Sequence, residues 1–167
     1  MKSIKYQEIY KLIESVVSDE NDMIANMANT AAVLHEAFGF WWVGFYIVKP
    51  ACSALAADAD AADRCCTADE KELVLGPFQG PLACTRIKKG RGVCGTTWAR
   101  EETIIVPDVE QFPGHIACSS LSRSEIVVPI YNGDRVVAVL DIDSEHLATF
   151  DDIDREWLER IVQLLNW

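Results

Sequence analysis

The sequence predicts an α+β fold in which a central, largely antiparallel sheet is flanked by N- and C-terminal helices. Apolar residues at helical spacing mark both ends of the chain, and short β-branched and aromatic segments fill the middle. Asn132-Gly133-Asp134 is a strong hairpin turn signal. The 167 residues, half of them hydrophobic, suffice for one core, so we expect a single domain over residues 1–167.

The first part of the chain is predicted to form two helices and a strand. Apolar residues at helical spacing in 4–17 indicate the first helix. Ser18-Asp19 is suited to cap a second helix, which ends at Gly39 because glycine readily adopts the left-handed conformation at helix ends. Residues 40–48 are aromatic and β-branched, and we expect a strand there.

An Ala/Asp-rich tract interrupts this pattern. We interpret residues 51–71 as a flexible insertion between two strands, since the tract has neither helical nor strand periodicity. Strands are expected to resume at 72–78 and 83–87. The insertion carries three of the six cysteines, and we expect these three to be incidental to function: Cys52, Cys65 and Cys66.

The second half of the chain is predicted to hold most of the loops. Residues 92–99 indicate a short helix, and 103–106 a strand. Residues 109–124 form a long loop with room for one helical turn, and long loops in compact domains are often functional. A hairpin over 125–131 and 135–143 follows, and then a last helix capped by Thr149.

Charge and hydropathy exclude several classes of partner. The net charge of −11 argues against nucleic acid and anionic membranes. No apolar run approaches the roughly 20 residues that span a bilayer, and the N-terminus lacks the pattern of a signal peptide. We therefore expect a cytoplasmic protein. In that reducing compartment, cysteines are buried, metal-bound or reactive.

Nearby glycine and proline residues hold three cysteines at turns or segment ends, where a side chain can face a cleft: Cys84, Cys94 and Cys118. This setting suggests thiol redox chemistry. Burial is an equally natural reading of Cys94, whereas His115 is expected to be a loop residue without a role. A metal site is not expected, because the chain has no Cys-x-x-Cys pair and its three histidines show no ligand spacing.

Three acids are predicted to meet at one end of the hairpin. Alternation places Asp141 and Asp143 on one face of their strand, above Val137 and Val139. Glu125 begins the antiparallel partner strand and therefore lies beside them. Acids this close repel one another unless they bind a cation or one stays protonated. The alternative is an exposed strand end with solvated carboxylates.

Aromatic residues on the first strand suggest a binding wall. Trp42, Gly44 and Tyr46 share one face, and Gly44 leaves a notch where a small molecule could approach the sheet. A wall of Trp42 and Tyr46 opposite acids suits a methyl-sulfur group with an amine nearby. Packing into the core is the simpler interpretation of these rings.

Together, these segments resemble the free methionine-(R)-sulfoxide reductases, which are single GAF-domain enzymes. The resemblance covers nearly the whole chain apart from the insertion, where family members commonly have a short turn. It is carried by the segments 42–46, 75–80, 90–95, 112–118, 124–129 and 140–144, which read WVGFY, LGPFQG, GRGVCG, FPGHIAC, SEIVVP and LDIDS.

The resemblance implies a role for each candidate residue. Cys118 would attack the sulfoxide sulfur of free methionine-(R)-sulfoxide and become a sulfenic acid, Cys84 would resolve it as a Cys84–Cys118 disulfide, and Cys94 would assist. A thioredoxin-like protein would reduce the disulfide, so no bound cofactor is required. The proton donor and ammonium ligands would come from Glu125, Asp141 and Asp143, while Trp42 and Tyr46 would bind the methyl-sulfur end.

Two other functions remain open from the sequence. One is a non-catalytic GAF sensor of a small molecule, although the chain shows no output domain and lacks both the Asn-Lys pair of cyclic-nucleotide-binding GAF domains and a Cys-His dipeptide for a bilin. The other is a dimeric adaptor that uses the N-terminal helices. Whether the chain forms a homodimer is not decided by the sequence.

Overall fold

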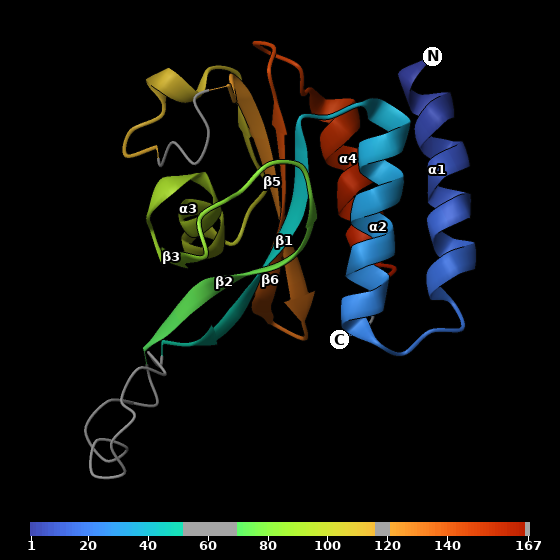
Figure 1. Ribbon diagram of the computed structural model, residues 1–167, viewed down its shortest axis with the longest axis horizontal. Helices are drawn as coiled ribbons and strands as arrows, with labels where there is room; N and C mark the ends of the chain where they lie inside the picture. The colour runs from blue at the N-terminus through green and yellow to red at the C-terminus, as the bar shows by residue number, and fades with distance from the viewer. Residues whose placement is uncertain (52–69, 116–120, 166–167) are drawn as a thin grey trace, which may run out of the picture.

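The computed structural model describes residues 1–51, 70–115 and 121–165 (Figure 1). Within these residues, six strands form one sheet in the order β3-β2-β1-β6-β5-β4, and every neighbouring pair is antiparallel. The expected α+β fold with an antiparallel sheet is therefore confirmed. The strands are β1 (Trp42–Pro50), β2 (Lys71–Gln79), β3 (Arg86–Lys88), β4 (Ile104–Val106), β5 (Ser124–Asn132) and β6 (Arg135–Ser144).

Helices cover the two faces of this sheet unequally. In Figure 1, α1, α2 and α4 stand together on one side, while α3 lies on the other side beside β3. A short 3₁₀ turn, η1, supplies the helical turn expected in the long loop. The bounds are α1 (Lys2–Val17), α2 (Met23–Phe38), α3 (Gly92–Arg100), η1 (Val109–Gln111) and α4 (Asp152–Val162).

Alternation along β1 divides the buried residues between the two faces. Val43, Phe45 and Ile47 pack in the large cluster beneath α1, α2 and α4, whereas Trp42 and Tyr46 pack in a second cluster with α3. The first cluster carries most of the hydrophobic core. The α3 face therefore has room for polar residues, and the candidate site lies there.

Both predicted helix caps lie a few residues from the real ones. Helix α2 is capped by Asp22, whose side chain accepts a hydrogen bond from Ala25 N at 2.9 Å, and not by Ser18-Asp19. Helix α4 is capped by Asp151 in a capping box with Asp154, and not by Thr149. An aspartate that closes a reciprocal box outcompetes a nearby threonine, and the Thr149 hydroxyl instead donates to Ser144 Oγ at 2.8 Å.

The prediction that Val137 shares a strand face with Asp141 and Asp143 is wrong. Tyr131 pairs with Val136 after Ile130 pairs with Ala138, so Val137 is an extra residue on β6. This irregularity turns Val137 toward the α1, α2 and α4 face and leaves Val136 on the α3 face. Toward the far end of β6 the alternation is regular, so the placement of Asp141 and Asp143 is unaffected.

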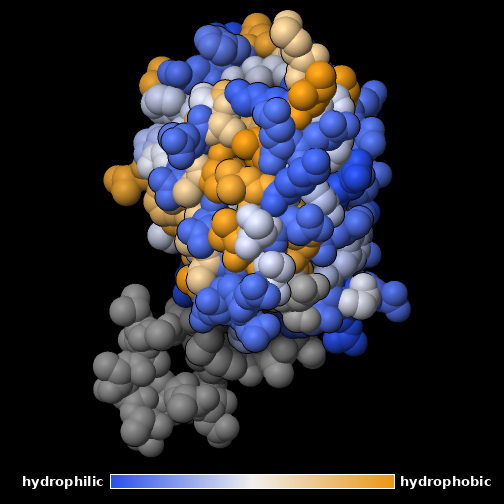
Figure 2. Space-filling view, turned by 90° about the vertical axis from the view of Figure 1, so that its right-hand side faces the viewer, coloured by the Kyte–Doolittle hydropathy of each residue, from blue (hydrophilic) through white to orange (hydrophobic). Residues whose placement is uncertain are grey.

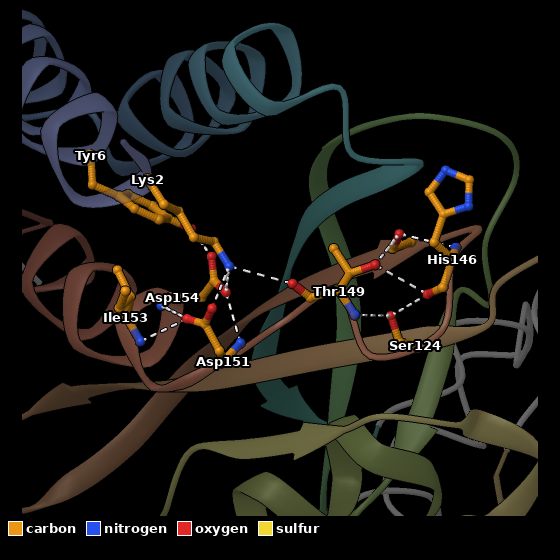
Figure 3. A network of polar contacts seen from close by, with 9 residues as sticks. Lys2, Tyr6, Ser124, His146, Thr149, Asp151, Ile153 and Asp154 are labelled. Carbon is orange, nitrogen blue, oxygen red and sulfur yellow. Dashed lines mark hydrogen bonds and ion pairs between the residues drawn. The ribbon is translucent and has the colours of Figure 1, made fainter.

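A polar network fixes α4 to the first turns of α1 (Figure 3). Buried Asp154 accepts a hydrogen bond from the Tyr6 hydroxyl at 2.8 Å and pairs with the Lys2 ammonium. Lys2 also reaches Asp151 at 3.1 Å. In the same view, the Ser124 hydroxyl at the start of β5 donates to the His146 carbonyl at 2.6 Å. These contacts fix the connection from β6 to α4.

The predicted insertion falls between β1 and β2, and its residues 52–69 lie outside the described part of the chain. The described ends are paired, because Pro50 is opposite Lys71 and Ala51 N donates to Glu70 O at 2.9 Å. No helix in the described residues has both the length and the apolar composition needed to cross a membrane.

Candidate active site

A pocket opens on the α3 face of the sheet, at the end where β1 begins and β6 ends. Its empty volume is about 570 Å³ when the open space at its mouth is included. Side chains from β1, β5 and β6 form its floor, and the segments before and within α3 form its walls. The lining residues are Trp41, Trp42, Tyr46, Pro81, Leu82, Ala83, Ile87, Gly92, Val93, Cys94, His115, Ser122, Glu125, Asp141 and Asp143.

The three predicted acids meet at this pocket. Glu125 on β5 is paired directly with Asp143 on β6, and Asp141 follows on the same face. The exposed fractions of Glu125 and Asp141 are only 5% and 6%. The alternative of a solvated strand end is therefore wrong: residue pairing brings the acids together, and the covering segments remove them from water.

Burial disfavours the charged form of these carboxyl groups. It raises the pKa of both Glu125 and Asp141 well above the usual range, and nearby carboxylates raise them further. The pKa of Asp143 rises only to about 6, also through burial, because a hydrogen bond from the Ser122 hydroxyl opposes the shift. At neutral pH, Asp143 is thus the acid that most readily carries a negative charge.

A hydrogen bond joins the side chains of Glu125 and Asp141. Burial raises the pKa of both groups, so the pair favours its protonated form. The Cys94 thiol also bonds to Asp141. The Asp141 carboxyl group is thus bonded to both Glu125 and Cys94.

Cys94 is a buried, free thiol, so the burial expected for it is confirmed. Desolvation, followed by the charges of Asp141 and Glu125, raises the pKa of this thiol well above its ordinary value. Ligand atoms of these three residues lie within 4.8 Å of one another, close enough for a metal ion. Protons held by the same groups would compete with a metal for them.

The aromatic wall forms as predicted, but the notch does not. Tyr46 and Trp42 line the pocket with ring centroids 6.0 Å apart. A Cβ at Gly44 would lie 2.3 Å from the Trp42 ring and 2.5 Å from Phe78 Cβ, so the space above Gly44 is filled by side chains. Gly44 makes room for Trp42, and the ligand space lies beyond that ring.

Described residues on either side of the other two predicted thiols line the pocket or lie next to lining residues. Cys84 follows the lining residue Ala83 in the loop between β2 and β3, and its carbonyl accepts a hydrogen bond from Tyr46 at 3.0 Å. Cys118 lies outside the described residues. On either side of residues 116–120, His115 and Ser122 both line the pocket.

Three lining residues were not expected from the sequence. His115 was considered without a role, yet its Nδ1 lies 3.9 Å from Glu125 Oε2, and burial lowers its pKa. Ser122 bonds to Asp143, and Trp41 joins the aromatic wall. The sequence signal for all three is adjacency: Trp41 precedes Trp42, His115 lies within the FPGHIAC segment, and Ser122 follows that segment.

Comparison with known proteins agrees with this fold and site. The GAF domain family model matches residues 22–167. A crystal structure of free methionine-R-sulfoxide reductase from Neisseria meningitidis in complex with its substrate superposes with a TM-score of 0.83 at 53% identity, covering 99% of this chain and 88% of that one.

Two curated relatives carry the same name. The free methionine-R-sulfoxide reductase of Escherichia coli is 37% identical over 96% of this chain and 86% of its own length. That of Saccharomyces cerevisiae is 36% identical over 92% of this chain and 79% of its own length. The chain belongs to the GAF-domain family of free methionine-R-sulfoxide reductases.

Proposed function

We propose that the protein reduces free L-methionine-(R)-sulfoxide to L-methionine in a thiol-dependent reaction. The observation that carries this proposal is the cluster of the buried Glu125 and Asp141 with the half-buried Asp143, beside the wall of Trp42 and Tyr46. The rings suit the methyl-sulfur end of the substrate, and the acids suit its ammonium and its oxygen.

The acids divide two tasks between them. Asp143, whose pKa is about 6, is ionised at neutral pH and binds the ammonium group. Glu125 holds a proton and donates it to the sulfoxide oxygen, which is a poor leaving group without one. Asp141 is hydrogen-bonded to Glu125 and Cys94 and so holds both in place.

The thiols of Cys118 and Cys84 supply the two electrons that reduce the sulfoxide. The Cys118 thiolate attacks the sulfoxide sulfur, and the protonated oxygen ends on Cys118 as a sulfenic acid while methionine leaves. The Cys84 thiolate then attacks the Cys118 sulfur, releasing water and forming a Cys84–Cys118 disulfide. Support comes from the lining positions of Ala83, His115 and Ser122, which adjoin the two cysteine segments. Cys94 can replace Cys84 only slowly, since its raised pKa keeps it a thiol.

A thioredoxin-like protein returns the disulfide to two thiols and completes the cycle. This reductant supplies both electrons, so the reaction requires no bound cofactor and no metal. We place the cycle in the cytoplasm, where thiols are kept reduced.

A homodimer is proposed on the surface of α1 that Figure 2 faces, where apolar side chains lie among charged ones. Ile4, Leu12 and Val16 are exposed there. Two copies of α1 packed antiparallel would place Ile4 near Val16 and Lys5 near Glu14 of the second copy, so that charges as well as apolar surface match. Light scattering on the wild type and on Leu12→Glu measures this directly: a dimer that Leu12→Glu splits supports it, and a monomeric wild type contradicts it.

The test of the reaction is a turnover assay with a thioredoxin system on separated R and S epimers of free methionine sulfoxide. We expect turnover of the R epimer, little of the S epimer, and little of peptide-bound sulfoxide as the control. Cys118→Ser should abolish activity. Activity that survives this change would refute the thiol mechanism, while tight nucleotide binding without any sulfoxide turnover would favour the sensor function instead.

A further inference from the structure

The candidate pocket contains an unused hydrogen-bond donor. The indole nitrogen of Trp41 is buried and has no partner among the described residues. By contrast, Trp42 Nε1 donates to Pro81 O at 3.1 Å, and the Tyr46 hydroxyl donates to Cys84 O at 3.0 Å. A buried N–H without a partner costs free energy, so its retention in a ligand pocket points to a ligand acceptor.

The remaining side-chain donors of the pocket are directed to the acids. Ser122 bonds to Asp143, and Cys94 bonds to Asp141. His115 also has an unpartnered Nδ1, but that atom lies 3.9 Å from Glu125 Oε2. Trp41 is therefore the unpartnered side-chain donor that is not aimed at the acid cluster, as far as the described residues extend.

The register places Trp41 away from the greatest concentration of negative charge. Val43 pairs with Gln79 on β2, and the Trp41 carbonyl would be 3.0 Å from a Cβ at Gly80, so Trp41 lies toward the β2 side of β1. Asp141 and Asp143 lie on β6 and Glu125 lies on β5, and both strands are on the opposite side of β1 from β2. An anionic group of a ligand is repelled least at the Trp41 side.

The substrate of the proposed reaction carries such a group. A free amino acid has its carboxylate on the same carbon as its ammonium. With the ammonium on Asp143, which is paired with Trp42, we place the carboxylate beside Trp41, the residue before Trp42 and a lining residue of the same pocket. Helix α3 also begins at this pocket without a side-chain cap, and its positive end favours an anion.

We propose that the Trp41 indole N–H donates a hydrogen bond to the substrate carboxylate and so selects the free amino acid. This inference rests on the proposed function for the identity of the ligand. It makes Trp41 a substrate-binding residue that acts through KM, since the carboxylate is far from the sulfur that reacts.

The test pairs a protein change with a substrate change. Trp41→Phe keeps a ring and removes the donor. The substrates are free methionine-(R)-sulfoxide and 3-(methylsulfinyl)propylamine, which lacks the carboxylate. We expect Trp41→Phe to raise KM for the free amino acid about 10- to 100-fold, as for the loss of a hydrogen bond to a charged group, with kcat nearly unchanged. The kcat/KM for the amine should be equal in both proteins.

The variant Trp98→Phe serves as a matched control, and calorimetry gives a second readout besides turnover. Trp98→Phe, in the same buried cluster but outside the pocket lining, reports the cost of trimming a tryptophan and should leave KM unchanged. An equal loss in kcat/KM on both substrates, or no loss on either, would overturn the proposal. The backbone N–H groups of α3 would then be the candidates for binding the carboxylate. If neither protein turns over sulfoxide, the proposed function fails, and calorimetry with L-methionine against 3-(methylthio)propylamine still decides the role of Trp41.

Discussion

A carboxylate at position 143 lowers the stability of the folded protein. Its pKa is near 3.8 in an unfolded chain and about 6 in the fold, because burial disfavours the charge. Between these two values the folded state binds more protons than the unfolded state. Stability therefore falls as pH rises from about 4 to about 6 and remains lower above that range.

We expect Asp143→Asn to stabilise the protein while it impairs the enzyme. The gain at pH 7 should be up to about 3 kcal/mol and should be much smaller near pH 4, where Asp143 is protonated in the folded state and only partly ionised in the unfolded state. Urea unfolding at pH 4 and pH 7 measures it, with Asp134→Asn in the exposed hairpin turn as control. KM for the sulfoxide should rise at pH 7. Equal stability changes at both pH values would show that the charge at Asp143 is not the cause.

At the scale of elements, α1 and α4 depend on each other through the network of Figure 3. The Asp154 side chain is fully buried, and the Tyr6 hydroxyl is one of its partners. Removing one partner of a buried acid leaves it partly unsatisfied, which is more costly than the average hydrogen bond.

Tyr6→Phe should lower the free energy of unfolding by about 1–3 kcal/mol and leave KM and kcat unchanged, because the network and the pocket lie on opposite faces of the sheet. Tyr10→Phe, one turn further along α1, is the control and should change stability much less. Chemical unfolding and steady-state kinetics give the two readouts. A change in KM of more than about threefold would show that the helical layer and the pocket are coupled.

Much at this scale was predictable from the sequence, because each feature has a local cause. Strand alternation placed Asp141, Asp143 and Glu125 at one point, and Gly39 correctly ended α2. Features decided by tertiary contacts were not predictable. The extra residue Val137 depends on cross-strand register, and the occupant of the space at Gly44 depends on how Trp42 packs.

At the scale of the whole molecule, the insertion and the pocket lie at opposite ends of the β1–β2 pair. The insertion follows Pro50, whereas the nearest pocket-lining residue on β1 is Tyr46, four residues earlier. At about 3.3 Å per residue, the end of β1 is roughly 13 Å from the pocket along the strand. The ends of β1 and β2 already pair as a hairpin.

Replacing residues 52–69 by an Asn-Gly turn should therefore leave kcat and KM within about twofold of the wild type, since this turn suits a two-residue hairpin. The same variant retains Cys84, Cys94 and Cys118, so it also tests whether the other three cysteines contribute to recycling. A large loss in kcat with a thioredoxin system would assign the insertion a catalytic role.

The contact between Tyr6 and Asp154 joins residues 148 positions apart. During synthesis at about 5–20 residues per second, Tyr6 leaves the ribosome roughly 7–30 s before its partner is made. During that interval, the apolar side of α1 that packs against α4 in the folded protein remains uncovered. The interval between translation of the first and last helices is thus the period in which the nascent chain is most exposed to aggregation and most dependent on chaperones.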